Sequence, residues 1–249
     1  MIDLHTHVLP GIDDGPATIA DSLELLADSV ASGVRAVAAT PHVRDDYPTT
    51  ADAMERLVAT LRREAEANSI ALEILTGGEI ALERLPVTSM TELRRFGLGG
   101  NSRYLLVEFP YYAWPLGLAQ QLAGLRSSGF RVVLAHPERN AEVQAAPGRL
   151  EPLVHSGTLI QLTAASVSGA LGRRCQATAL RLLELGLAHL LSSDIHARGG
   201  RAGLAAAVKE LSDETLAQWL TTDVPKAIVS DEALPLRPPR RRSRPWKGR

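Results

Sequence analysis

Short runs of apolar and β-branched residues alternate along the chain with longer stretches in which apolar and polar positions follow a helical period. The short runs predict strands at residues 2–7, 34–40, 71–76, 103–108, 131–135, 158–162 and 189–192. Strands separated in this way by amphipathic helices are typical of repeated βα units around a parallel sheet. The pattern therefore predicts an α/β protein with seven strands arranged as a barrel.

Between the strands, apolar residues recur at the 3.6-residue period that places them on one face of an α-helix. The stripes are Leu23, Leu26, Ala27 and Val30, then Met54, Leu57, Val58 and Leu61, then Leu118, Leu122 and Leu125, and finally Leu180, Leu183 and Leu187. Gly33 is placed to end the first helix. No linker or internal repeat marks a second domain, so we expect a single domain over residues 1–232.

The composition is that of a globular protein, with 249 residues of which 45% are hydrophobic and 22% are charged. This length suits one barrel, and the composition excludes disorder for most of the chain. The single cysteine, Cys175, excludes an intrachain disulfide and a cysteine-rich zinc site. No apolar run has the roughly 18 residues of a membrane helix, and the first residues lack the features of a signal peptide. We therefore expect a cytoplasmic protein.

The formal charge of −1 conceals a strong asymmetry between the body and the end of the chain. Residues 1–232 carry 20 basic and 28 acidic residues, a balance of −8, whereas residues 233–249 carry a charge of +7. The basic residues of this last segment are Arg237, Arg240, Arg241, Arg242, Arg244, Lys247 and Arg249. We expect a disordered tail there. It fits a solvated end as well as weak contact with an anionic surface, and no nucleic-acid partner is predicted.

Histidine and acidic residues fall at the ends of most of the predicted strands. Barrel enzymes place their chemistry at these carboxyl ends. The candidates are His5, His7, Asp14, His42, Glu79, Glu108, His136, Asp194 and His196. His5 and His7 are two residues apart and so share one face of a strand, and the same spacing recurs at Asp194 and His196. Five imidazoles and four carboxylates can hold two or three divalent ions.

Two arginines close to these positions are candidates for binding a phosphoryl group. Arg139 follows His136, and Arg201 follows His196. A guanidinium group matches phosphate oxygens in geometry and charge, although a surface ion pair explains either arginine about equally well.

Other ionisable residues are given no role in this chemistry. His155 lies near a helix end before Gly157, and His189 opens the last predicted strand at the opposite face of the barrel. Asp13 is expected to brace its turn through backbone N–H groups, and Glu138 is expected to face solvent.

Cys175 and Arg181 have the spacing of cysteine-dependent phosphatases, but residues 176–180 contain no glycine to form a phosphate cradle. Because Cys175, Ala179 and Leu183 follow one another at four-residue spacing, the cysteine is interpreted as a buried helical residue.

Taken together, the motifs resemble a known family. MIDLHTH, LPGIDDG, ATPH, GGE, VEFP, AHPER and SSDIH occur in this order between residue 1 and about Arg201. They resemble the PHP superfamily of metal-dependent phosphoesterases and are similar, more narrowly, to the bacterial tyrosine phosphatases of capsule and exopolysaccharide synthesis, the CpsB/YwqE/CapC group. Asp14 and Glu108, where many other PHP members carry histidine, favour this branch.

The resemblance implies a distorted (β/α)7 TIM-like barrel with three divalent ions, manganese first, with iron, zinc, cobalt or magnesium as alternatives. By this resemblance one ion is held by His5, His7, Glu79 and Asp194, a second by Glu79, Glu108 and His136, and a third by Asp14, His42 and His196. Arg139 and Arg201 would bind the phosphoryl group. The implied substrate is a phosphotyrosine protein, such as the tyrosine-rich tail of a membrane-associated bacterial tyrosine kinase. A homo-oligomer is compatible with the sequence.

The chemistry can also be argued without the family. Clustered divalent ions lower the pKa of bound water and draw charge from phosphoryl oxygens. A phenolate leaving group, with a reference pKa of about 10, needs less help from a general acid than an alkoxide does.

Three alternatives stay open: a histidinol-phosphate or other small-molecule phosphatase, an amidohydrolase, and an inactive scaffold in polysaccharide assembly. A carboxylated lysine is excluded for the amidohydrolase, because Lys209, Lys226 and Lys247 all follow the last predicted strand.

Overall fold

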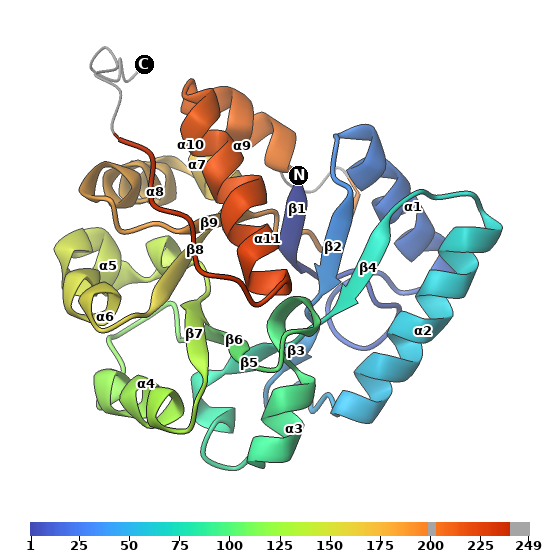
Figure 1. The fold of residues 1–249 in the computed structure, drawn as a ribbon, viewed down its shortest axis with the longest axis horizontal. Coiled ribbons are helices and arrows are strands. Elements are labelled where there is room, and N and C mark those ends of the chain that lie inside the picture. Colours follow the sequence, from blue (N-terminus) through green and yellow to red (C-terminus); the bar gives the residue numbers. More distant parts are fainter. Residues whose placement is uncertain (199–202, 240–249) are drawn as a thin grey trace.

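The computed structural model describes residues 1–198 and 203–239, in which helices surround a set of parallel strands (Figure 1). The strands are β1 (Ile2–Thr6), β2 (Ala36–Ala39), β3 (His42–Val43), β4 (Glu73–Thr76), β5 (Glu79–Ala81), β6 (Tyr104–Glu108), β7 (Arg131–Leu134), β8 (Leu159–Thr163) and β9 (Leu190–Ser192). They form a curled sheet in two segments, with the order β1-β2-β4 in one and β3-β5-β6-β7-β8-β9 in the other. The chain is thus a single mixed α/β domain, as predicted.

The helices follow the strands along the chain and pack on the outside of the sheet. The α-helices are α1 (Ile19–Ala31), α2 (Ala51–Ala67), α3 (Met90–Arg95), α4 (Leu118–Ser127), α5 (Ala141–Ala145), α6 (Glu151–His155), α7 (Ala164–Val167), α8 (Arg173–Leu185), α9 (Leu204–Leu211), α10 (Glu214–Gln218) and α11 (Val224–Val229). Shorter turns are the 3₁₀ helices η1 (Leu82–Arg84), η2 (Leu98–Gly100), η3 (Pro137–Arg139) and η4 (Pro147–Leu150), and the π-helix η5 (Trp219–Asp223).

All seven predicted strand positions contain strands, but two of the runs are followed by a second short strand. Pro41 separates β2 from β3, and the pair Gly77 and Gly78 separates β4 from β5. Proline has no N–H to donate to a ladder, and glycine lets the backbone bend sharply, so both interrupt the pairing. As a result β2 and β4 pair in one segment of the sheet, whereas β3 and β5 pair in the other. The described residues therefore contain nine strands.

The first and last strands meet and bring the two ends of the sheet together. Thr6 and Ile195 form a parallel bridge. On either side of it, the N–H of His7 donates to the carbonyl of Ile195 and the N–H of Asp194 donates to the carbonyl of His5, both at 2.9 Å. The contact curls the sheet and places the ends of β1 and β9 side by side. At the opposite end of the strands, α11 packs on β1 and η2, and Asn101 Nδ2 donates to the carbonyl of Ile228 at 2.6 Å.

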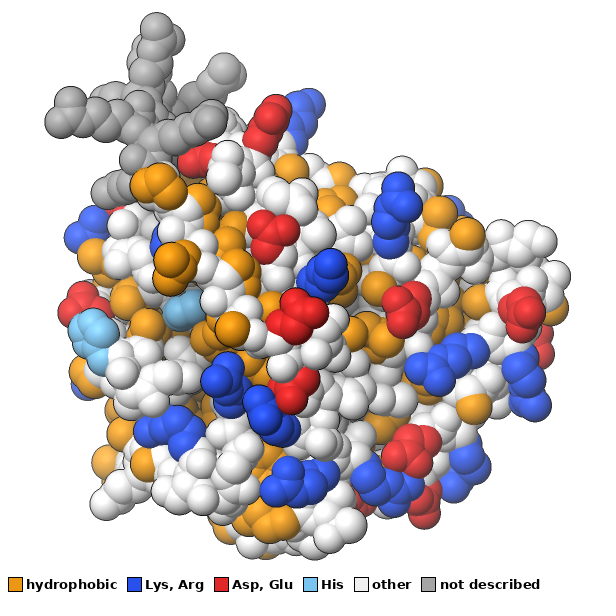
Figure 2. Space-filling view, in the orientation of Figure 1, with side chains coloured by type: hydrophobic (Ala, Val, Ile, Leu, Met, Phe, Trp, Pro, Cys, Tyr) orange, Lys and Arg blue, Asp and Glu red, His pale blue; other side chains and the backbone are white. Residues whose placement is uncertain are grey.

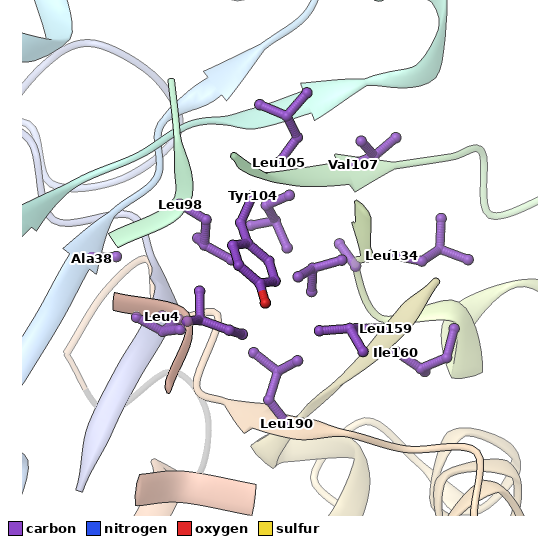
Figure 3. Packing of buried hydrophobic residues seen from close by; sticks show 14 of the residues in the cluster. Leu4, Ala38, Leu98, Tyr104, Leu105, Val107, Leu134, Leu159, Ile160 and Leu190 are labelled. Carbon is purple, nitrogen blue, oxygen red and sulfur yellow. The ribbon is translucent and has the colours of Figure 1, made fainter. Parts of the chain in front are cut away.

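Apolar side chains fill the interior toward the amino-terminal ends of the strands. Tyr104, Leu4, Leu98 and Leu190 are fully buried and surround a common centre (Figure 3). Leu105, the next residue of β6, points to the opposite side of its strand, as the two-residue period of a strand requires. The hydroxyl of Tyr104 accepts a hydrogen bond from Arg131 Nη1 at 2.8 Å, so this buried polar group is satisfied.

The predicted apolar stripes are confirmed in α4, where Leu118, Leu122 and Leu125 are all buried. The stripe predicted for α1 is partly wrong, because Leu25 is buried and Ala27 is exposed. The buried face of α1 includes Ser22, whose hydroxyl donates to the carbonyl of Thr18 at 3.2 Å. A serine that satisfies its hydroxyl within the helix can be buried, and hydropathy does not show this.

The outer faces of the helices carry charged residues, which are interspersed by sign over the face drawn in Figure 2. Arg95 of α3, for example, pairs with Glu55 of α2 at 2.6 Å. None of the described helices combines the length and the apolar character needed to cross a membrane.

The folded body extends beyond the predicted boundary at residue 232. Leu234 packs against the core, and the carbonyl of Pro235 accepts a hydrogen bond from Trp219 Nε1 at 3.1 Å. Arg237 donates to the carbonyls of Ala188 and Leu183 at 2.9 and 2.8 Å. The prediction of a disordered tail is therefore wrong for residues 233–239, because Arg237 bonds backbone acceptors near the end of α8. The remaining basic residues of the predicted tail, from Arg240 to Arg249, lie outside the described residues.

His189 lies just before β9, at the amino-terminal ends of the strands. Its Nδ1 accepts the backbone N–H of Ile160 at 3.1 Å, and its ring lies 6.3 Å from that of Trp219. Burial, assisted by the positive charge of Arg237, lowers the pKa of His189 to about 4. The ring is therefore a neutral acceptor in the folded protein, which agrees with the sequence analysis in giving it no part in the strand-end chemistry.

This environment predicts a pH-dependent contribution of His189 to stability. In the unfolded chain a histidine has a pKa of about 6.5, so the unfolded state takes up a proton as the pH falls through this value and the folded state does so only near pH 4. Stabilisation by His189 is thus complete above pH ~6.5 and is lost as the pH falls toward 4. Urea unfolding should show the stability difference between wild type and His189→Leu shrinking by about 2 kcal/mol between pH 7.5 and 4.5. Parallel pH profiles for the two proteins would contradict this account.

Candidate metal centre

The nine predicted ligands all lie at the carboxyl ends of the strands. Four belong to strands: His5, His42, Glu79 and Glu108. The other five stand in the segments that follow β1, β7 and β9: His7, Asp14, His136, Asp194 and His196. The contact between β1 and β9 brings residues from the two ends of the sequence to the same place. The convergence expected from the strand-end pattern is therefore present in the structure.

The most deeply buried group consists of His5, His7, Glu79 and Asp194, none of which is more than 1% exposed. The Nε2 atoms of His5 and His7 are 3.3 Å apart. Each lies 3.4 Å from Glu79 Oε2, and they lie 3.4 and 3.5 Å from Asp194 Oδ1. Four ligands bound tetrahedrally at about 2.1 Å from one ion would be about 3.4 Å apart. These five distances match the spacing of ligands around one divalent transition-metal ion.

A second group lies nearer to solvent, around Asp14. Asp14 Oδ1 is 3.3 Å from Nε2 of His42 and 3.3 Å from Nε2 of His196. The ring of His196 stacks on that of His7, with 3.9 Å between centroids. These four side chains together could hold a metal ion.

The third group connects to the first through the two oxygens of Glu79. Glu79 Oε1 is 2.7 Å from His136 Nε2, whereas Oε2 faces His5 and His7. His136 Nε2 is also 3.9 Å from Glu108 Oε2. One carboxylate therefore lies between two sets of donors, as a bridging ligand must.

Hydrogen bonds to the far nitrogen of several imidazoles leave the other nitrogen free to bind a cation. His5 Nδ1 is 3.2 Å from Gln161 Oε1, and His7 Nδ1 is 2.8 Å from Asp13 Oδ2. His196 Nδ1 lies 2.9 Å from the carbonyl of Asp194. Since these oxygens accept hydrogen bonds, each Nδ1 is assigned as the donor, and in the neutral imidazole each Nε2 would present a lone pair to a cation. Sequence analysis missed Gln161, because it lies in the middle of a predicted strand.

The imidazoles and carboxylates of the site are buried, and each shifts the pKa values of its neighbours. Burial lowers the pKa of His7, but Asp13, Asp194 and Glu79 outweigh it and raise the pKa well above its usual value. Burial likewise opposes the charge of His42, yet Asp14 and Glu79 raise its pKa to about 9. Burial alone would raise the pKa of Glu79, but the surrounding imidazoles hold it well below the ordinary value.

Glu108 Oε2 is buried without a hydrogen-bond partner among the described residues, and His42 Nδ1 and Glu79 Oε2 lie 2.8 Å apart without forming a well-aligned hydrogen bond. Buried polar atoms normally have partners, so unpaired donors that converge in this way fit the coordination of cations. Burial and the charge of Glu79 also raise the pKa of Glu108 to about 8. The residue types and their arrangement therefore fit divalent metal ions.

Backbone constraints hold several of these residues in place. His136 and Asp194 have φ angles of 34° and 54°, which are uncommon for residues other than glycine and often mark functional sites. Gly78 precedes Glu79, and a Cβ atom at Gly78 would lie 2.6 Å from the ring of Phe96. Only glycine allows the backbone to approach Phe96 so closely and still direct Glu79 into the site.

A cavity of about 390 Å³ opens beside the ligands and is lined by Arg139, Arg44 and Tyr111. Arg139 Nη1 is 2.7 Å from Asp194 Oδ2, and its guanidinium lies 4.5 Å from the centroid of the Tyr111 ring. Arg44 Nη1 is 3.3 Å from Glu108 Oε1. The structure therefore places Arg139 at the cavity as predicted, whereas Arg201 lies outside the described residues. Sequence analysis missed Arg44, which follows the short strand β3 and belongs to no motif.

The predictions for two other acidic residues, Asp13 and Glu138, have different outcomes. Asp13 braces its turn as predicted, because its carboxylate accepts the backbone N–H groups of Gly15 and His42 at 3.1 Å. The prediction that Glu138 faces solvent is wrong, since it is fully buried and accepts the N–H of Thr163 at 2.9 Å. Because η3 turns the chain inward after His136, Glu138 points to the end of β8 rather than to water.

Cys175 is only half-buried, so the prediction of a buried position is partly wrong. Cys175 lies near the start of α8, where its sulfur accepts a hydrogen bond from Gln144 Nε2 at 3.5 Å. Ala179, on the same face of the helix, is fully buried. Partial burial and the charge of Glu138 raise the pKa of the thiol. A raised pKa disfavours the thiolate, which is the nucleophilic form.

The fold and the site define the class of the protein: α/β proteins in which imidazoles and carboxylates at the carboxyl ends of parallel strands can bind metal ions. Within this class, the chain belongs to the CpsB/CapC family of capsular polysaccharide synthesis, whose model matches residues 1–230.

Individual relatives agree with the family. The chain is 34% identical over 197 residues to the tyrosine-protein phosphatase YwqE of Bacillus subtilis, covering 79% of this chain and 77% of the relative. It is 27% identical over 249 residues to the tyrosine-protein phosphatase CpsB of Streptococcus pneumoniae, covering 94% and 100% of the two chains. A crystal structure from work on YwqE and CpsB, described as unique metal-dependent tyrosine phosphatases, matches with a TM-score of 0.82 and 31% identity. That match covers 97% of this chain and 100% of the other.

The central place of Glu79 predicts that metal binding depends on its charge. After dialysis against Mn²⁺, elemental analysis should find more than one ion per wild-type chain and a loss of at least one ion in Glu79→Gln, because the amide removes the anion shared by two groups of donors. The matched control is Glu55→Gln, an exposed glutamate of α2. Equal metal content in all three proteins would exclude Glu79 as a ligand.

Proposed function

We propose that this chain is a metal-dependent phosphatase that hydrolyses phosphotyrosine in proteins. The observation that carries the proposal is the convergence of nine imidazole and carboxylate side chains beside a cavity that Arg139 lines. The names of the relatives YwqE and CpsB, both tyrosine-protein phosphatases, point to the same reaction.

The donor set supports a proposal for the ions. The first would be held by His5, His7, Glu79 and Asp194, the second by Glu79, Glu108 and His136, and the third by Asp14, His42 and His196. We propose manganese for these positions and a distorted seven-unit barrel of the PHP type as the fold. Bound divalent ions would lower the pKa of water and draw charge from the phosphoryl oxygens.

The residues of the chain itself would bind and orient the phosphate. Arg139 offers a planar set of N–H donors that suits phosphoryl oxygens, and its ion pair with Asp194 keeps it at the cavity. The ring of Tyr111 lies against the guanidinium of Arg139 and forms part of the cavity wall. A phenolate leaves readily, so the reaction needs no strong general acid. Attack by water also needs no side-chain nucleophile, which agrees with the raised pKa of Cys175.

The proposed substrate is a phosphotyrosine protein, in particular the tyrosine-rich tail of a membrane-associated tyrosine kinase that controls polysaccharide synthesis. We propose that the reaction takes place in the cytoplasm, where such a tail would be reached. Membership of a capsular polysaccharide synthesis family supports this setting. Self-association and contact of the basic tail with an anionic surface stay predictions.

Activity should depend on the metal ligands and not on the thiol. With p-nitrophenyl phosphate and Mn²⁺, His136→Ala should lower kcat/KM at least about 100-fold, because a buried ligand is lost. Cys175→Ser should stay within about twofold of wild type, because hydrolysis by water bypasses the thiol. A steady-state assay of the three proteins makes the comparison.

Other outcomes would contradict the proposal and favour another mechanism or function. Loss of activity in Cys175→Ser would indicate a cysteine mechanism. Faster turnover of histidinol phosphate than of a phosphotyrosine peptide would favour a small-molecule phosphatase. Fewer than one transition-metal ion per chain, together with no turnover, would favour a scaffold.

The phosphoryl-binding role of Arg139 predicts a defect even in a variant that keeps the positive charge. Arg139→Lys should lower kcat/KM for aryl phosphates by about 10-fold to 100-fold, because lysine lacks the planar pair of donors. Arg149→Lys is the matched control, since Arg149 is exposed, pairs with Glu142 and does not line the cavity. Equal rates for the two variants would remove Arg139 from phosphate binding.

A further inference from the structure

Two large apolar side chains stand in solvent close to the candidate active site. Tyr112 and Leu116 are 81% and 95% exposed. Both belong to the segment 109–117, which joins β6 to α4 and begins directly after Glu108. Their neighbour Tyr111 lines the cavity. Apolar groups of this size exposed beside a functional site commonly mark a contact surface.

The segment that carries them is held in a defined conformation. Asn140 Nδ2 donates to the carbonyls of Pro110 and Ala113 at 2.7 and 2.9 Å, and the N–H of Ala141 donates to the carbonyl of Tyr111 at 2.9 Å. Because Asn140 follows Arg139, these bonds join the segment to the residue at the cavity. These bonds hold the backbone on both sides of Tyr112.

Other side chains of the segment pack inward and show that its exposed residues are a distinct set. The ring of Trp114 meets Phe109 edge to face at 6.0 Å, and the guanidinium of Arg149 lies 5.0 Å from the Trp114 centroid. Trp114 thus finds partners, whereas Tyr112 and Leu116 do not pack into the core. The segment has an inner side that secures it and an outer side that is apolar.

We propose that Tyr112 and Leu116 form a docking surface for the polypeptide that flanks a phosphotyrosine, and this inference rests on the function proposed above. Consecutive residues of an extended chain are about 3.3 Å apart, so residues next to a phosphotyrosine in the cavity would pass over its rim. Tyr111 lies at the cavity and Tyr112 lies in solvent, so the surface is continuous with the site. Apolar and aromatic residues, such as neighbouring tyrosines, are the flanking residues that this surface fits.

A second copy of the chain is a less suitable occupant. A stable dimer buries about 800 Å² on each partner, which two side chains cannot supply. A single flanking segment needs far less area, because the phosphate and its tyrosine contribute the remaining affinity in the cavity.

The test compares a substrate that fills only the cavity with one that also reaches the rim. The small substrate is p-nitrophenyl phosphate, and the peptide carries one phosphotyrosine with unmodified tyrosines on both sides. The variants are Tyr112→Ser, Leu116→Ser and the double variant. Leu236→Ser is the matched control, because Leu236 is 94% exposed but follows Pro235, which bonds Trp219 near the amino-terminal ends of the strands.

The double variant should lower kcat/KM for the peptide about fivefold to twentyfold and leave that for p-nitrophenyl phosphate within about twofold. Leu236→Ser should change neither value. An unchanged ratio of the two rates would overturn the docking surface and leave the proposed phosphatase intact. Wild-type hydrolysis of p-nitrophenyl phosphate without hydrolysis of the peptide would overturn both. Loss of a dimer in the double variant, with peptide turnover unchanged, would assign the surface to a second copy and overturn the proposal.

Discussion

The attraction between the carboxylate of Glu79 and the imidazoles around it is the interaction on which the site depends. A fully buried carboxylate is strongly destabilising unless charges and hydrogen bonds compensate for the loss of water. Here His5, His42 and His136 all lie within 3.4 Å of a Glu79 oxygen, and each comes from a different strand or strand end. The same charge therefore holds separate parts of the sheet together and prepares the donors for cations. The contact between Glu79 and the imidazoles therefore both stabilises the fold and arranges the candidate metal ligands.

This arrangement is possible because the interior is divided along the direction of the strands. Toward the amino-terminal ends, Tyr104 and its apolar neighbours exclude water, and α11 covers that end. Toward the carboxyl ends, the interior changes to imidazoles and carboxylates within a few residues of the same strands. In β1 the change falls between Leu4, which packs in the core, and His5, which enters the site.

Much of the site was predictable because strand-end position is encoded locally. The two-residue spacing of His5 and His7 at the end of β1 is a local feature, and the nine candidate ligands followed from where short apolar runs stop. Contacts between distant residues were not predictable in this way. Gln161 and Arg44 reach the site from positions that no motif marks. Glu138 looked exposed because the inward turn of η3 is set by tertiary packing. Arg237 was misjudged for a related reason, because its guanidinium bonds backbone carbonyls whose position the sequence does not show.

Arginine and tyrosine side chains lie beside the candidate metal ligands on two sides of the site. On one side the guanidinium of Arg139 lies 4.5 Å from the centroid of Tyr111, whose ring is 5.8 Å from His136. On the other, Arg44 lies 5.2 Å from the centroid of Tyr47, whose ring stacks 5.8 Å from His42. In both cases one aromatic ring lies close to an arginine and to an imidazole of the site, and the face of the ring attracts the guanidinium. An anion that enters the cavity between Arg139 and Arg44 would meet positive charge from both guanidinium groups and, with ions bound, from the metal site as well. Arg139 and Arg44 thus place two positive charges in the wall of the cavity beside the candidate ligands.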